Sequence, residues 1–154
     1  MTEASFEDFT AITRRVYEYA YGIDTRNFEL YRSIFTDVIA MNFHSYNGEP
    51  ERALQADEWV AGCRVLFEGL DATQHTMTNP LVDVVGDRAR CRMYMQAEHF
   101  LTTDQGGNSY VLGGYYDDRL VRTGEGWLIE AVTLNVHWHR GNRHIMTMAL
   151  EQGA

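Results

Sequence analysis

Several features are scarce or missing in this sequence, and each absence narrows the class of protein. Cysteine occurs only twice, as Cys63 in a helical pattern and Cys91 in a strand pattern, so we expect buried free thiols rather than a disulfide framework. No stretch approaches the roughly 18 apolar residues of a membrane span, and residues 1–10 contain acids but no apolar run, which argues against a signal peptide. The sequence has no internal repeat and no low-complexity tract. A soluble cytoplasmic protein is therefore expected.

Basic residues are outnumbered by acidic ones. The 13 Lys and Arg against 22 Asp and Glu give a formal net charge of -9, which argues against nucleic acid or an anionic membrane surface as the main partner. A length of 154 residues suffices for one substantial core but not for two ordinary ones, so residues 1–154 are predicted to form a single domain. Aromatic residues make up 12% of the chain, which suits a pocket for a ring-shaped ligand and an ordinary core equally well.

The first half of the sequence shows helical periodicity, with apolar residues at spacings of three and four. Gly22 is typical of a residue that follows a helix end, so Asp24 is expected just beyond the first helix. Asn27 is a plausible N-cap for the second. The predicted elements are helices over 5–21, 27–35 and 57–70, a strand over 37–44 and a loop over 45–55.

After Asp71 an alternation with period two dominates, and it predicts long strands over 73–85, 88–101, 109–122 and 127–140, with a bend or bulge at Pro80. The cleanest alternation gives one apolar face made of Ala89, Cys91, Met93, Met95, Ala97 and His99. Helices followed by long antiparallel strands indicate an α+β fold, a strongly curved, mostly antiparallel sheet with helices on one side. The interior of such a cone must be filled by side chains or by a ligand.

His75 stands at the start of the first long strand. A lone histidine there is more often a hydrogen-bonded structural residue, and the spacing alone favours that interpretation. The functional alternative is proton transfer, because an unperturbed imidazole has a pKa of about 6.5 and exchanges protons near neutrality. Asp24 is the candidate partner, since a carboxylate on the far ring nitrogen would fix the tautomer and stabilise the imidazolium.

His137 and His139 share one strand face, and His144 follows. The pattern could hold a metal ion, but no upstream carboxylate has a convincing spacing, so an exposed strand end is favoured and no metal is expected. Cys63 and Cys91 lack an adjacent base in the sequence, and a thiol nucleophile is not expected.

Three short segments resemble the SnoaL-like branch of the NTF2-like α+β barrel superfamily, in particular the scytalone dehydratases and lindane dehydrochlorinases: Gly22-Ile23-Asp24-x-Arg26, Thr73-Gln74-His75 and Glu125-Gly126-Trp127. The resemblance runs through most of residues 6–138. It implies a cone-shaped barrel with three N-terminal helices and a base-assisted elimination that needs no cofactor. In that reaction His75 removes a proton, Asp24 orients it, and water or another group leaves.

The same resemblance implies a pocket around this pair. The two tyrosines that position a water in scytalone dehydratases fall near Ile23 and Phe43, which cannot hydrogen-bond, and Thr123 takes the place of a pocket arginine of the dehydrochlorinases, one residue after Arg122. His99 matches a second pocket histidine, and Gly113-Gly114-x-Tyr116 matches the strand of the pocket floor. The expected substrate-binding residues are His99, Tyr116, Phe43, Ile23, Met95 and Tyr21.

We therefore expect a lyase of the dehydratase type, or a related isomerase or cyclase, acting on a hydrophobic cyclic or polyketide-like substrate. The alternative is a binding or accessory domain with the same cone and no chemistry, because fold alone does not decide function. The resemblance further implies a homo-oligomer, a dimer or trimer formed through the outer sheet face. Tyr94 and Val111 are the candidate contacts there, although the row Arg88, Arg90 and Arg92 favours a partly solvated face.

Overall fold

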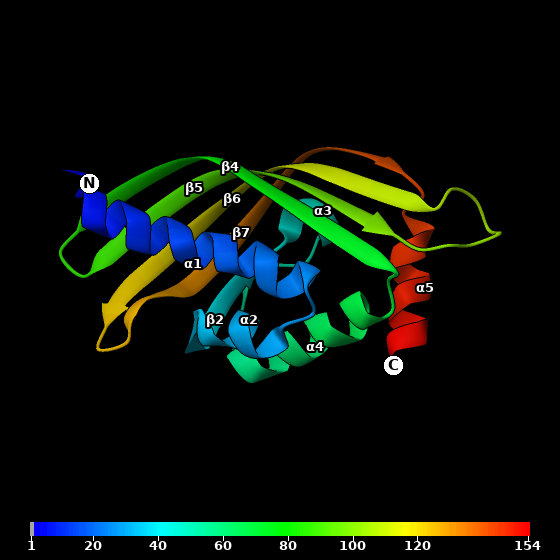
Figure 1. The fold of residues 1–154 in the computed structure, drawn as a ribbon, viewed down its shortest axis with the longest axis horizontal. Helices are drawn as coiled ribbons and strands as arrows, with labels where there is room; N and C mark the ends of the chain where they lie inside the picture. The colour runs from blue at the N-terminus through cyan, green and yellow to red at the C-terminus, as the bar shows by residue number, and fades with distance from the viewer. Residues whose placement is uncertain (1) are drawn as a thin grey trace.

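The structure is a computed structural model that describes residues 2–154. Within these residues, seven strands form one sheet in the order β1-β4-β5-β6-β7-β2-β3. Figure 1 shows the sheet as an arch with α1, α2 and α4 on its concave side, as expected for an α+β cone. The strands are β1 (Thr2–Glu3), β2 (Phe35–Asn42), β3 (Arg52–Gln55), β4 (Ala72–Val85), β5 (Arg88–Phe100), β6 (Ser109–Thr123) and β7 (Gly126–Gly141).

The four long strands β4 to β7 form an antiparallel meander, and their predicted positions are confirmed to within one or two residues. The predicted bend at Pro80 is also confirmed. The pairing of β4 with β5 shifts between Thr78 and Leu81, and Asn79 has a positive φ of 56°. A second irregularity separates Gly113 from Gly114 in the β6–β7 ladder. These irregularities bend the strands and help to close the sheet around an interior.

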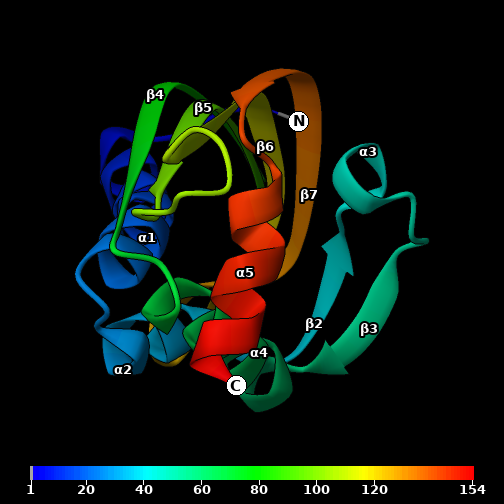
Figure 2. The same ribbon diagram turned by 90° about the vertical axis from the view of Figure 1, so that its right-hand side faces the viewer.

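The helices within residues 2–154 number five rather than the three N-terminal helices expected, and they are α1 (Phe6–Asp24), α2 (Phe28–Ser33), α3 (His44–Asn47), α4 (Ala56–Glu68) and α5 (His144–Gly153). The predicted loop over 45–55 contains part of α3 and all of β3, which pairs with β2. Helix α5 was not expected. Figure 2, viewed from the α5 end, shows this helix in front of the arched sheet and the β2–β3 pair to one side.

The first helix runs three residues further than predicted, because Gly22 does not end it. A Cβ on Gly22 would lie 2.9 Å from the Cβ of Tyr31, so this glycine allows α1 and α2 to approach closely. The chain turns instead at Arg26, which has a positive φ of 58°. Asp24 is thus the last residue of α1, and the N-cap predicted at Asn27 is confirmed by a 3.0 Å hydrogen bond from the Leu30 backbone N–H.

The two faces of β5 differ as the alternation predicted. The residues expected to face inward, from Ala89 to His99, are all buried against the core. On the outer face Arg90 donates to Asp117 at 2.7 Å and Arg92 donates to Asp83 at 2.9 Å, so that face carries ion pairs between neighbouring strands. Tyr94 is 59% exposed there, whereas Val111 is only 8% exposed in the single chain. Val111 is paired with Glu98 and so lies on the outer face as expected, but its low exposure leaves little area for a contact.

Two thiols and one carboxyl are among the polar side chains buried in the core. Cys63 and Cys91 are free and buried, as expected, and burial raises the pKa of each thiol to about 12. Asp118 lies on the opposite strand face from Asp117, and its Oδ1 has no hydrogen-bond partner among the described residues. Burial, together with the charge of Asp117, raises the pKa of Asp118 well above its ordinary value and so favours the protonated carboxyl. None of the helices in residues 2–154 has the length and apolar character that a membrane crossing requires.

Candidate active site

The C-terminal end of α1 meets the first residues of β4, and this junction brings Asp24 and His75 together. Nδ1 of His75 lies 2.7 Å from Oδ1 of Asp24, and the His75 backbone N–H donates to Oδ2 at 2.7 Å. The Thr73 hydroxyl donates to Oδ1 at 2.9 Å. Both carboxylate oxygens are thus held by the first residues of one strand, which fixes the orientation of the imidazole as well as that of the carboxylate.

Arg26 extends this hydrogen-bond network through Thr73. Its left-handed conformation turns the chain back, and its Nη1 donates to the Ile23 carbonyl at 2.8 Å and to Thr73 Oγ1 at 2.8 Å. Because Thr73 Oγ1 accepts from Arg26, its own proton is directed at Asp24. Thr73 and Arg26 belong to the segments on which the resemblance rests, but no positioning role was predicted for either of them.

The hydrogen bonds decide the protonation of the pair. Burial of Asp24 acts to raise its pKa, but hydrogen bonds from His75 and Thr73, together with the charge of His75, outweigh burial and lower that pKa. An ionised carboxylate can only accept, so the proton between the two side chains belongs to Nδ1 of His75. The other ring nitrogen, Nε2, is then unprotonated in the neutral imidazole and available to take a proton.

A cavity of about 410 Å³ opens beside this pair, and both His75 and His99 line it. The His75 side chain is 4% exposed and that of Asp24 is 20% exposed, so the histidine forms part of the interior wall and the aspartate stands behind it. The charged lining residues Glu49 and Arg52 are exposed, which places an opening of the cavity at the segment between α3 and β3. The apolar part of the lining consists of Ile23, Met41, Phe43, Pro50, Trp59, Leu66, Phe67, Ala97, Leu112, Leu134 and Met146.

The second histidine is held differently from the first. Nδ1 of His99 lies 3.2 Å from the Tyr110 carbonyl, which can only accept, so Nδ1 carries the proton and Nε2 is an acceptor. The Phe67 ring stacks on His99 with centroids 6.3 Å apart and meets His75 edge-on at 6.0 Å. The two imidazoles lie 5.8 Å apart. Burial, with the charge of His75 adding to it, lowers the pKa of His99 to about 4.

We expect His99 to stay neutral throughout the range in which such a pair works. Since its pKa is lowered to about 4, protonation of His99 should begin only below about pH 5, and its ring ¹⁵N shifts should stay constant between pH 6 and 8. A ¹⁵N-edited spectrum with His99→Gln for assignment measures this, and the exposed imidazole of His144 serves for comparison. Titration of His99 above pH 6 would contradict the buried, neutral state described above.

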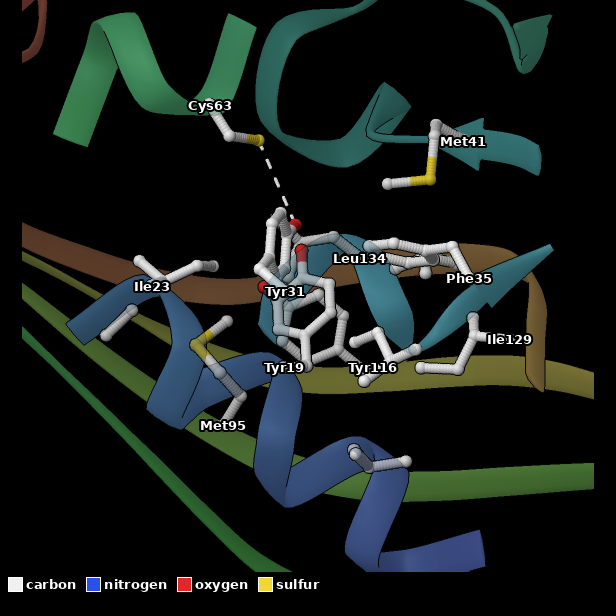
Figure 3. Close-up of a cluster of buried hydrophobic side chains, with 14 of the residues drawn as sticks. Tyr19, Ile23, Tyr31, Phe35, Met41, Cys63, Met95, Tyr116, Ile129 and Leu134 are labelled. Carbon is white, nitrogen blue, oxygen red and sulfur yellow. Dashed lines mark hydrogen bonds between the residues drawn. The ribbon is translucent and has the colours of Figure 1, made fainter. Parts of the chain in front are cut away.

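Of the six expected substrate-binding residues, four line the cavity and two do not. Ile23, Phe43, His99 and Tyr116 are part of the lining. Tyr21 is not, because it lies two positions from Ile23, on the other side of α1, and is 63% exposed. Met95 is also absent from the lining, because it packs within the core beside α1 (Figure 3).

Several residues that the resemblance placed near the pocket do not line the cavity and make other contacts instead. Gly113 and Gly114 are not lining residues. A Cβ on Gly114 would lie 1.9 Å from the Asn135 carbonyl oxygen, so this glycine serves close strand contact. Arg122 pairs with Asp8 at 3.0 Å, away from the cavity lining.

The histidines of the last strand are exposed: His137 packs on the Tyr115 ring and His139 on the Tyr110 ring. No group of three or more His, Cys, Asp or Glu in residues 2–154 lies together as a metal site would require.

The sequence of the chain agrees with a known protein family. The sequence pattern of the SnoaL-like domain matches residues 4–133, and the chain belongs to that family. Its structure is similar to that of the Kfla4162 protein from Kribbella flavida, with 29% sequence identity, a TM-score of 0.87, and coverage of 92% of this chain and 97% of that one. A comparison with curated proteins found no match to this chain.

Two further solved structures share the fold at lower identity. A candidate scytalone dehydratase from Novosphingobium aromaticivorans is 20% identical with a TM-score of 0.76, and 88% of each chain is covered. A type 2 hexachlorocyclohexane dehydrochlorinase, LinA, is 15% identical with a TM-score of 0.74, and 90% of this chain and 93% of that one are covered. These likenesses establish the NTF2-like fold, while the reaction must be argued from the residues of this chain.

Proposed function

We propose that this protein is a cofactor-independent lyase that eliminates water or a comparable leaving group from a hydrophobic cyclic or polyketide-like substrate. The observation that carries the proposal is the Asp24–His75 pair, built into the wall of a largely apolar cavity with Nε2 of the imidazole left free. Small-molecule lyases share this fold, and the family to which the chain belongs is compatible with that chemistry.

The proposed reaction begins with proton removal from carbon. Nε2 of His75 takes a proton from the carbon next to a substrate carbonyl, and the electrons of that C–H bond move toward the carbonyl oxygen as an enolate. The imidazolium that forms is held against the ionised Asp24 at 2.7 Å, which stabilises its charge. The enolate then expels the group on the neighbouring carbon, a double bond forms, and His75 returns its proton to the leaving oxygen, so that water departs.

The surroundings of the pair favour this use over a purely structural one. An apolar wall excludes water, which strengthens the electrostatic interaction between imidazolium and carboxylate and keeps the base from being solvated. The cavity volume of about 410 Å³ lies in the usual range of small-molecule sites and suits a compact ring system. Phe43 and Trp59 both line it, with ring centroids 5.2 Å apart, and offer flat surfaces to such a ligand.

A panel of hydroxylated aromatic ketones tests the proposal, with formation of the conjugated double bond followed by ultraviolet absorbance. We expect turnover by the natural chain and its loss in His75→Ala, because no other imidazole in the lining has a carboxylate partner among the described residues. The matched control is His144→Ala, which removes an exposed imidazole outside the lining.

Two outcomes would count against a lyase. If activity on the panel survives both His75→Ala and Asp24→Asn, the pair is not the acid-base catalyst. If several compounds bind the natural chain and none reacts, the alternative gains, namely a binding or accessory domain that uses the same cavity without chemistry. Calorimetric titration of the same panel separates binding from turnover.

A further inference from the structure

The opening of the cavity carries one arginine without a partner among the described residues. Arg52 begins β3, and within residues 2–154 no other arginine lines the cavity. The chain has no lysine, so all 13 of its basic side chains are arginines. Only Arg52 and Arg119 among them form no ion pair, side-chain hydrogen bond or aromatic contact within the part of the chain that the structure describes. A free guanidinium therefore stands at the entrance of a largely apolar cavity.

The pairing of β2 with β3 shows that Arg52 belongs to the inner face of the sheet. It lies directly opposite Met41, a buried lining residue, and residues directly opposite in an antiparallel pair share a face. Leu54, two residues further along β3, packs against the core on that same face. Arg52 is itself exposed, so its side chain borders both the apolar interior and water.

The order of the strands separates Arg52 from the base. His75 lies in β4 and Arg52 in β3, and four strands stand between them in the sheet. Figure 2 shows β4 and β3 on opposite sides of the view. Both residues nevertheless line the same cavity. A ligand that presents a carbon atom to His75 can therefore direct another group toward the opening, where Arg52 meets it.

A single guanidinium suits an anion of single charge. Its planar fork of N–H donors matches the two oxygens of a carboxylate, and it stays charged throughout the working pH range of proteins. Glu49 also lines the opening and repels anions, and this repulsion is greater for a group of nearly double charge such as a phosphate monoester. An ionised group is costly to bury without a partner, so the charged end of a ligand stays at the opening while its apolar part enters the cavity.

We propose that Arg52 selects ligands that carry a carboxylate, and that it binds this group at the opening of the cavity while the ring of the ligand lies inside. The substrate class that follows is a cyclic ketone that bears a carboxylic acid group. This inference rests on the proposed function, whose substrate it names more closely, but the binding it describes requires no turnover. Arg52 lies outside the residues that the sequence assigned to the pocket.

The test compares cinnamate with cinnamamide in calorimetric titrations of the whole chain at pH 7, because the two molecules share a planar skeleton and differ in charge. We expect the natural chain to bind both probes, and Arg52→Gln to weaken the binding of cinnamate by about 2- to 5-fold, the usual strength of an exposed ion pair. The affinity for cinnamamide should be unchanged. Arg52→Lys should keep most of the affinity for cinnamate, since it keeps the charge. The effect of Arg52→Gln should shrink in salt of about 1 M, where the screening length is about 3 Å.

Two further variants complete the design. Glu49→Gln removes the competing carboxylate from the opening, so it should tighten the binding of cinnamate and leave that of cinnamamide unchanged. Arg119→Gln is the matched control, because Arg119 is the other arginine without a partner among the described residues, is exposed, and lies outside the lining. This variant should change neither affinity.

The results that would overturn the role of Arg52 are distinct from those that would overturn the lyase. The role is wrong if the natural chain does not bind cinnamate, if Arg52→Gln leaves that affinity unchanged, or if both probes weaken equally, which would mean packing only. An equal effect of Arg119→Gln would also overturn it, because the cause would then be net charge. Selective loss of cinnamate in Arg52→Gln, in a chain that turns over no ketone, would keep the carboxylate site and remove the proposed reaction.

Discussion

Replacing Asp24 with asparagine is expected to slow the proposed elimination by about 100- to 10,000-fold, the range that positioned acid-base groups contribute. Asparagine keeps the size of the side chain but lacks the charge that stabilises the imidazolium at 2.7 Å. Its amide can also present an N–H to Nδ1 of His75, which would place the proton on Nε2 and leave the base in the wrong tautomer. The measurement is kcat/KM of Asp24→Asn against the natural chain over pH 5 to 9.

Stability provides a second measurement on the same variant. Because the pKa of Asp24 is lowered in the folded chain, its carboxylate stabilises the fold above the ordinary pKa of 3.8, and this contribution is lost as the pH falls through the lowered value. Asp24→Asn should therefore unfold at a lower temperature than the natural chain at pH 7, and the difference should shrink below about pH 4. Asp104→Asn, at an exposed carboxylate, is the control. Full activity in Asp24→Asn would remove the central pair from the mechanism.

A second large effect is expected at Gly69, where α4 ends against α5. A Cβ at this position would lie 1.9 Å from the carbonyl oxygen of Ala149, a backbone atom that cannot move without displacing α5. Gly69→Ala should lower the free energy of unfolding by about 2 kcal/mol or more, in the range of overpacked cores. Thermal unfolding followed by circular dichroism measures this. Because Met146 of α5 lines the cavity, ligand affinity should fall as well.

Gly62→Ala is the matched control for this effect. Gly62 lies inside the same helix, and a Cβ there meets nothing within 4 Å. Alanine is a better helix former than glycine, so this variant should be more stable than the natural chain by up to about 1 kcal/mol. Equal melting temperatures for Gly62→Ala and Gly69→Ala would show that α5 does not pack on α4 as described.

The long strands could be predicted from the sequence because their pattern is local. In β5 every second residue from Ala89 to His99 is apolar or buried, and the alternate residues include the arginines of the outer face, so the period of two is unambiguous. The Asp24–His75 junction was predicted from short segments that resemble a family, and the structure adds how it is held. Thr73 and Arg26 supply that support, and their contacts span about fifty residues of sequence, which no local pattern reveals.

The predictions from the sequence failed where tertiary contacts, rather than local sequence patterns, determine the structure. Gly22 has the sequence character of a helix end, yet its lack of a side chain serves the approach of Tyr31. Helix α5 is short and follows the exposed end of β7, so its pattern was too brief to stand out. Tyr19 also lines the cavity, and it could have been noticed because it lies one helical turn before Ile23 on the same face of α1. Its ring contacts with Tyr31 and Tyr116 could not have been predicted, because only folding brings these residues together.

The burial of both cysteines has a practical consequence for spectroscopy. With a pKa of about 12, neither Cys63 nor Cys91 presents an appreciable amount of thiolate near neutral pH, and thiolate is the form that alkylating reagents attack. A cysteine introduced at an exposed site would therefore react far ahead of the native pair. Spin labels or fluorophores can be attached near the opening of the cavity, for example at Glu49→Cys, without first building a cysteine-free chain, and distance changes on ligand binding can then be read directly.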